Sequence, residues 1–180
     1  MNRLKLFLST FKNNKTYKNY AENLNLKGDE AVFELGSGIG YLSRHIAKKL
    51  RDGGYLTCGD ISDDSADMLK TMLRKYNNVN FCFGNIRRMN IECAIYDKLI
   101  LNDCLVNLSK SERESYLRFL LSLLKTDANI YVRQPISSQD GISSSEVRQL
   151  MRELGLKEVN YEFDKISKQT VYLATFKRNT

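Results

Sequence analysis

The chain of 180 residues lacks several features that mark specialised classes of protein. It has one proline, and no apolar run approaches the roughly 20 residues needed to cross a bilayer. The opening segment MNRLKLFLSTF has an apolar stretch too short for a signal peptide and no small-residue cleavage site. The composition, 42% hydrophobic and 27% charged, is far from that of disordered or collagen-like chains. We therefore expect one globular domain in the cytoplasm.

The four cysteines, Cys58, Cys82, Cys93 and Cys104, are widely spaced. The chain has no CxxC pair and only one histidine, so neither a zinc site nor a disulfide framework is indicated. We expect reduced thiols, two or three of them buried in strands, and no bound metal.

The net charge of +7 favours an anionic partner such as RNA, an acidic headgroup or a phosphorylated metabolite. The basic residues are scattered along the chain, and most are expected on solvated helix faces. The charge therefore leaves RNA open as a partner without selecting it.

Short apolar runs alternate with segments of helical periodicity from residue 31 onward. Ser62 or Asp63 is expected to cap the second helix, and Ser109 with Glu112 forms a capping box for a later one. The expected strands are 31–35, 55–59, 79–83, 98–101 and 128–133, the last closed by Pro135, and the expected helices include 42–50, 111–125 and 143–154. This alternation predicts a parallel sheet covered on both faces.

The end of the chain departs from this alternation. Segments 156–163 and 170–177 both have the pattern of strands, and the six residues between them are too few for a parallel crossover. The predicted fold class is therefore α/β, a doubly wound and mostly parallel sheet with a C-terminal antiparallel hairpin. Residues 1–23 are expected to form a helical cap on the domain of residues 24–180, although a basic amphipathic segment of this kind can also rest on an anionic membrane.

A glycine-rich turn, Gly36-Ser37-Gly38-Ile39-Gly40, follows the first strand. Ligands of open parallel sheets bind at this end of the strands, where the strand order reverses. The third glycine comes one position too early for the GxGxxG pattern of dinucleotide-binding proteins, and Glu34 would repel a pyrophosphate. The chain has no Gly-Lys-Ser/Thr sequence, which excludes a P-loop.

A cofactor with a cationic end and no phosphate suits this turn better, and S-adenosylmethionine has both properties. Asp60 stands at the end of the second strand, where a carboxylate can accept hydrogen bonds from both hydroxyls of an adenosine ribose. The residues therefore favour S-adenosylmethionine, with S-adenosylhomocysteine as the product.

The run VFELGSGIGYLSRHIAK, together with Asp60 in CGDIS, resembles the first two motifs of the class I S-adenosylmethionine-dependent methyltransferases. The resemblance covers roughly residues 30–133, and Phe83-Gly84-Asn85-Ile86 is similar to the third-strand motif of the family. It implies that Asn102, Asp103 and Cys104 lie beside the transferring methyl group and that Tyr17 and Tyr20 belong to a segment covering the cofactor. The cofactor-binding residues that it implies are Glu34, Gly36, Ser37, Gly38, Gly40, Asp60, Ile61, Asn85, Ile86 and Asn102.

The predicted activity is direct methyl transfer to a small molecule, such as a metabolite, a quinone-like ring or a lipid headgroup. The segment after the fourth strand reads NDCL and lacks the NPPY-like signature of amino methylation, which disfavours DNA or protein glutamine as acceptor. RNA methylation, or a non-catalytic cofactor-binding subunit, remains the alternative, and a homodimer is possible. No residue is clearly the catalytic base, for which Asp103 and Tyr20 are candidates, and Arg133 either binds an anionic acceptor or pairs with a local carboxylate.

Overall fold

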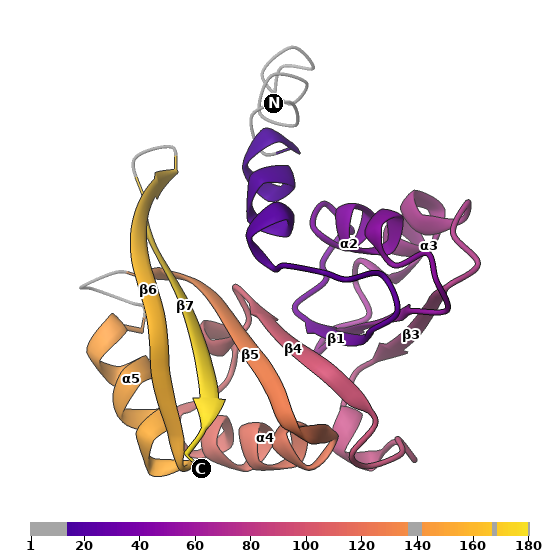
Figure 1. Cartoon of the computed structure of the whole chain (residues 1–180). Helices are drawn as coiled ribbons and strands as arrows, with labels where there is room; N and C mark the ends of the chain where they lie inside the picture. The colour runs from indigo at the N-terminus through magenta and orange to yellow at the C-terminus, as the bar shows by residue number, and fades with distance from the viewer. Residues whose placement is uncertain (1–13, 137–141, 167–168, 180) are drawn as a thin grey trace.

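The computed structural model describes residues 14–136, 142–166 and 169–179, and within them seven strands form one sheet (Figure 1). The strand order is β3-β2-β1-β4-β5-β7-β6. The strands are β1 (Ala31–Leu35), β2 (Tyr55–Asp60), β3 (Val79–Phe83), β4 (Tyr96–Asn102), β5 (Leu124–Ile136), β6 (Leu156–Ile166) and β7 (Gln169–Arg178). The first five strands run parallel, whereas β7 is antiparallel to both β5 and β6. The predicted parallel sheet with a terminal hairpin is confirmed.

Helices cover both faces of the sheet (Figure 1). They are α2 (Ser43–Lys49), α3 (Ala66–Leu73), α4 (Lys110–Ser122) and α5 (Ser144–Glu153), with short 3₁₀ turns at Ile86–Arg88 and Leu105–Asn107, and residues 14–23 are also helical. Because side chains alternate along a strand, Val32 belongs to the buried cluster that includes α2, α3 and the N-terminal helix, whereas Phe33 belongs to the cluster that includes α4 and α5. All five residues of β1 are consequently buried.

The sheet reverses its strand order beside β1, because β2 pairs with one edge of β1 and β4 with the other. The chain leaves β1 toward one face and β4 toward the other, so a crevice opens at the carboxyl ends of these two strands. The predicted site residues after β1, β2, β3 and β4 all lie along this end of the sheet.

Several predicted boundaries are wrong: β4 and β5 begin earlier, at Tyr96 and Leu124, and β6 ends later, at Ile166. For three further boundaries, hydrogen bonds or strand pairing give the reason. The second helix begins after Ser65, because the backbone N–H of Ser62 binds Asp60 and that of Asp64 binds Ser62. The helix α4 ends at Ser122, since Leu124 already pairs with Tyr96 of β4. Finally, β5 continues through Pro135 to Ile136, because pairing with β4 ends at Arg133 and only β7 flanks the strand at the proline.

Other local predictions are confirmed. The capping box of Ser109 with Glu112 is present, and Gly155, at φ +76°, follows the end of α5. Cys58, Cys82 and Cys104 are buried free thiols, whereas Cys93 is exposed.

The N-terminal segment is described from residue 14, and the part of the predicted cap formed by residues 1–13 lies outside the described residues. Tyr20 and Ala21 of its helix belong to the same buried cluster as Ile46 and Leu69, so this helix packs directly on the domain. No helix in the described ranges is long and apolar enough to cross a membrane.

Candidate functional site

The glycine turn after β1 adopts a conformation that favours glycine at each of its three glycine positions. The φ angles of Gly36, Gly38 and Gly40 are +88°, +49° and +90°. A Cβ atom on Gly36 would lie 2.0 Å from the carbonyl oxygen of Asn102, whereas one on Gly38 would meet no atom within 4 Å. Gly36 is therefore required by the close approach of the turn to β4, and Gly38 leaves space that a ligand can fill.

Hydrogen bonds attach this turn to the end of β2. The backbone N–H groups of Gly36 and Ser37 donate to the carbonyl oxygen of Gly59 at 2.9 and 3.2 Å. The N–H of Gly38 donates to Oδ2 of Asp60 at 2.8 Å. The structure thus brings the glycine turn and Asp60 together, as the sequence predicted.

The carboxylate of Asp60 is partly exposed and fixed in orientation. Its Oδ1 accepts the N–H of Ser62 at 3.3 Å while Oδ2 is held by Gly38. Each carboxylate oxygen has a further lone pair, so both can still accept a hydroxyl. This arrangement fits the two hydroxyls of a ribose.

Glu34, in contrast, is completely buried below the turn. Ser43 Oγ donates to its Oε2 at 2.6 Å, and Asn102 Nδ2 donates to its Oε1 at 3.1 Å. Burial raises the pKa of Glu34 to about 7, although these hydrogen bonds oppose the rise. The carboxyl group therefore links β1 to α2 through Ser43 and to β4 through Asn102. The sequence analysis did not predict the role of Ser43.

A polar network continues from Asn102 to the end of β5. Asn102 Nδ2 also lies 3.3 Å from the carbonyl oxygen of Gly36, and its Oδ1 accepts from Arg133 Nη1 at 3.4 Å. The buried Arg133 forms an ion pair with Asp103, whose side chain is partly exposed and whose backbone has a left-handed φ of +53°. Of the two roles considered for Arg133, the structure contains the pair with a local carboxylate.

The N-terminal helix closes over this network. The guanidinium of Arg133 lies 4.7 Å from the ring centroid of Tyr17, and Tyr17 stacks on Tyr41 of the glycine turn at 6.1 Å. Tyr20 lies one turn further along the helix and is buried, which raises the pKa of its hydroxyl. The helix therefore covers the carboxyl ends of β1 and β5.

Buried polar atoms without a partner gather at the same place. Of the four such side-chain atoms in the described part of the chain, three are Tyr20 Oη, Asp103 Oδ1 and Arg133 Nε. Buried polar groups are almost always hydrogen-bonded, so unpaired ones indicate that a polar ligand can occupy the space beside them. Tyr20 lies one helical turn beyond Tyr17, whose ring contacts Arg133, and Arg133 pairs with Asp103, so the three groups belong to one region.

The residues expected beside adenine lie at the ends of β2 and β3, where Asp60 pairs with Phe83. Ile61 is half-buried and Asn85 is exposed, with Oδ1 of Asn85 accepting from the Tyr116 hydroxyl at 3.4 Å. The side chain of Ile86 is completely buried in the core, so it supports the loop from below. Cys104 is also buried, and burial raises the pKa of its thiol, which makes it a poor nucleophile.

Comparisons with known proteins agree with this geometry. Residues 32–127 match the family model described as "Methyltransferase domain". Protein 235L of Invertebrate iridescent virus 6, which is named as a methyltransferase, is 21% identical over 126 residues, covering 70% of this chain. The chain spans 45% of the length of that relative.

Among the solved structures that share the fold, two are methyltransferases of bacterial origin. A S-adenosylmethionine-dependent methyltransferase from Aquifex aeolicus superposes with a TM-score of 0.72 at 14% identity, covering 89% of this chain and 88% of the other. The 1,6-didemethyltoxoflavin-N1-methyltransferase of Burkholderia thailandensis, solved with its substrate and S-adenosylhomocysteine, gives 0.73 at 14% identity and coverages of 93% and 79%.

Proposed function

The chain belongs to the class I S-adenosylmethionine-dependent methyltransferase family, and on that premise we propose that it transfers a methyl group to a small-molecule acceptor. The observation that carries the cofactor part of this proposal is the half-buried Asp60 carboxylate, oriented by the Gly38 N–H beside open space.

We assign the parts of the cofactor to three groups of residues. The methionine end lies on the glycine turn, the ribose on Asp60, and the adenine between the ends of β2 and β3. The residues so assigned are Glu34, Gly36, Ser37, Gly38 and Gly40 for methionine, Asp60 for ribose, Ile61, Asn85 and Ile86 for adenine, and Asn102 beside the methyl group. The side chains of Glu34 and Ile86 are both buried, so these two residues hold the glycine turn and the loop after β3 in position.

Bound S-adenosylmethionine supplies a methyl group that is already activated by the positive sulfur. The remaining tasks of the chain are to orient the acceptor, exclude water and remove a proton. Asp103 is the candidate base, because Arg133 holds one of its carboxylate oxygens and leaves Oδ1 without a partner. Burial also raises the pKa of Asp103, which favours acceptance of a proton from an acceptor hydroxyl or amine.

A small acceptor is favoured by the enclosure of this space. Tyr17 contacts both the glycine turn and Arg133, so the N-terminal helix roofs the carboxyl ends of the strands. A polynucleotide acceptor would have to reach the site past this helix, which a small molecule does more easily.

Calorimetric titration with S-adenosylmethionine, S-adenosylhomocysteine, NAD and ATP tests the proposal. We expect the first two alone to bind, and Asp60→Ala to weaken them about 10- to 100-fold through the loss of charge-assisted hydrogen bonds to the ribose. Asp64→Ala is the matched control, an exposed carboxylate four residues further along the same loop. Absence of binding, or equal effects of the two variants on binding, would refute the proposal. A separate measurement tests the acceptor: a methyl transfer rate that falls steeply with salt concentration would favour RNA over a small molecule.

A further inference from the structure

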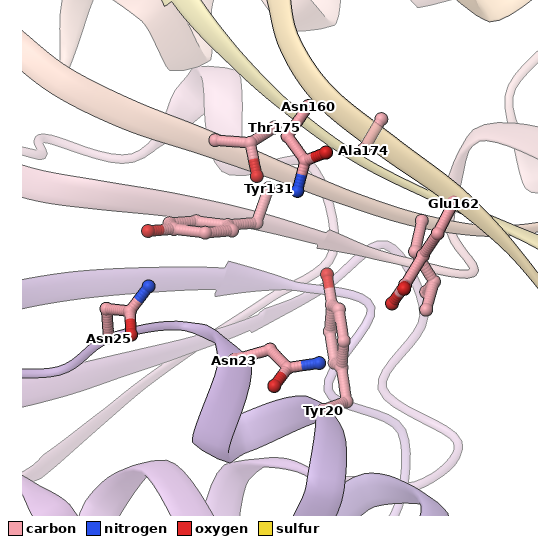
Figure 2. A pocket seen from close by; sticks show the side chains of 9 residues that line it. Tyr20, Asn23, Asn25, Tyr131, Asn160, Glu162, Ala174 and Thr175 are labelled. Atoms are coloured by element: carbon pink, nitrogen blue, oxygen red, sulfur yellow. The ribbon is translucent and has the colours of Figure 1, made fainter.

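A cavity of about 280 Å³ lies between the N-terminal helix and the C-terminal strands (Figure 2). We call it the hairpin cavity, because β6 and β7 form its outer wall. Its lining includes Tyr20 and Asn23 from the helix, Tyr131 from β5, Thr175 from β7, and Asn160 and Glu162 from β6. The volume is close to the lower limit for small-molecule pockets.

The strand register places one end of the hairpin cavity beside the proposed transfer site. Leu173, which lines the cavity, pairs directly with Arg133 across β5 and β7, and Thr175 pairs with Tyr131. Because Arg133 is also the partner of Asp103, the cavity runs along the sheet away from the candidate base.

Tyr20 lies between the hairpin cavity and the proposed transfer site. Its side chain lines the hairpin cavity, and in Figure 2 its hydroxyl end points toward the strands. That hydroxyl is buried without a hydrogen-bond partner, one helical turn beyond Tyr17, whose ring contacts Arg133. An unpaired buried hydroxyl at this boundary is an independent indication that a ligand with a polar atom passes here.

The charge of the lining favours a cation. Glu162 is the single charged side chain among the residues lining the hairpin cavity, and the polar remainder consists of asparagine amides and the hydroxyls of tyrosine and threonine. Two cations of the neighbouring strands are already paired, Lys98 with Glu30 and Arg133 with Asp103. A carboxylate beside tyrosine rings and amide oxygens is the combination that recognises an ammonium group.

We propose that the hairpin cavity binds a cationic amine group of the methyl acceptor, with Glu162 as its counter-ion and Tyr20 at the boundary with the transfer site. This inference rests on the proposed function, because it places the acceptor's reacting atom beside Asp103. The amine in the cavity is an anchor distinct from the atom that receives the methyl group.

The test is an NMR titration of the isotope-labelled full chain, saturated with S-adenosylhomocysteine, with choline and ethanolamine as cationic probes and with glycerol and propionate as neutral and anionic ones. We expect the cationic probes alone to shift the backbone amides of Asn160, Glu162 and Thr175. Glu162→Gln should weaken their binding about two- to fivefold, since it removes a counter-ion that is itself exposed. Asp164→Asn is the matched control, an exposed carboxylate on the same strand outside the lining, and it should leave binding unchanged.

Equal binding of glycerol and choline, shifts located elsewhere, or equal binding by Glu162→Gln and Asp164→Asn would each overturn the inference. A separate titration with S-adenosylhomocysteine keeps the two proposals distinguishable. If that ligand binds and the amines do not, the cavity assignment alone fails. If that ligand does not bind, the proposed function fails, and the same amine titration of the ligand-free chain still decides whether the cavity takes a cation.

Discussion

Asn102 donates its side-chain amide to Oε1 of Glu34 at 3.1 Å and so joins the carboxyl ends of β4 and β1. The carboxyl group of Glu34 is thereby held between two strands and a helix, without contact with solvent. Its protonation state is consequently coupled to the stability of the folded chain.

We predict that this coupling makes the wild-type chain less stable as pH rises through the range from about 4.5 to about 7. Burial raises the pKa of folded Glu34 to about 7 from 4.5, so folding favours the protonated form. Its contribution is fully present below pH 4.5 and is lost as the folded group ionises, a change of up to about 3 kcal/mol. Urea unfolding at several pH values should show this decline relative to Glu34→Gln, and parallel profiles would contradict it.

Substitution of two glycines with nearly equal φ angles distinguishes the cost of a steric clash from the cost of backbone strain. Gly36 and Gly53 have φ angles of +88° and +89°, but a Cβ would strike the carbonyl oxygen of Asn102 at the first and nothing at the second. We expect Gly53→Ala to cost about 1–2 kcal/mol of unfolding free energy from strain, and Gly36→Ala to cost at least about 2 kcal/mol more. Denaturant unfolding measures the cost of each substitution. Equal costs would show that the glycine turn can shift to accommodate the Cβ atom without disturbing β4.

The ion pair of the partly exposed Asp103 with the buried Arg133 predicts a measurable effect on stability. Asp103→Ala would remove the carboxylate partner of the buried Arg133 guanidinium, which keeps its bond to Asn102, so we expect a cost near the lower end of the range for buried pairs, about 3 kcal/mol. Asp103→Asn should cost less, because asparagine tolerates the φ of +53° and keeps an acceptor for Arg133. Glu114→Gln, which breaks the exposed pair with Arg118, should change the unfolding free energy by less than about 0.5 kcal/mol and serves as control.

The same pair of Asp103 variants tests catalysis. Asp103→Asn should retain binding of S-adenosylhomocysteine, because Asp60 and the glycine turn are unchanged, and it should lose methyl transfer to the acceptor. Turnover at the wild-type rate would exclude Asp103 as the base.

The hydroxyls of Tyr20 and Tyr131 should behave differently when removed. Tyr20 has no hydrogen-bond partner, so we expect Tyr20→Phe to leave the unfolding free energy unchanged or to raise it by about 1 kcal/mol. The Tyr131 hydroxyl donates to the carbonyl oxygen of Leu24 at 3.1 Å, so Tyr131→Phe should cost about 1–2 kcal/mol. Thermal and urea unfolding of both variants check the contrast, and destabilisation by Tyr20→Phe would reveal a protein partner for that hydroxyl.

Much of this fold is decided within short stretches of the chain. The capping box of Ser109 with Glu112 and the stop at Gly155 depend on residues a few positions apart, and the hairpin of β6 and β7 depends on a short connection. The glycine turn is likewise local, and its position after a buried strand was sufficient to predict a ligand site there. The prediction that Asp60 lies beside this turn needed only the alternation of strands and helices.

The tertiary structure decided what depends on distant residues. Glu34 is buried in contact with Ser43 and Asn102. The sequence around a carboxyl group at the end of a strand does not indicate whether that group is buried or exposed. The pair of Arg133 with Asp103 and the length of β5 follow from strand pairing. The hairpin cavity exists because helix residues near position 20 meet strands more than 100 residues later, as in the bond from Tyr131 to Leu24, which spans 107 positions. Local sequence patterns determine the helices, strands and turns. Burial and pairing between distant segments determine the protonation states of buried groups and the shape of the cavities in which a ligand can bind.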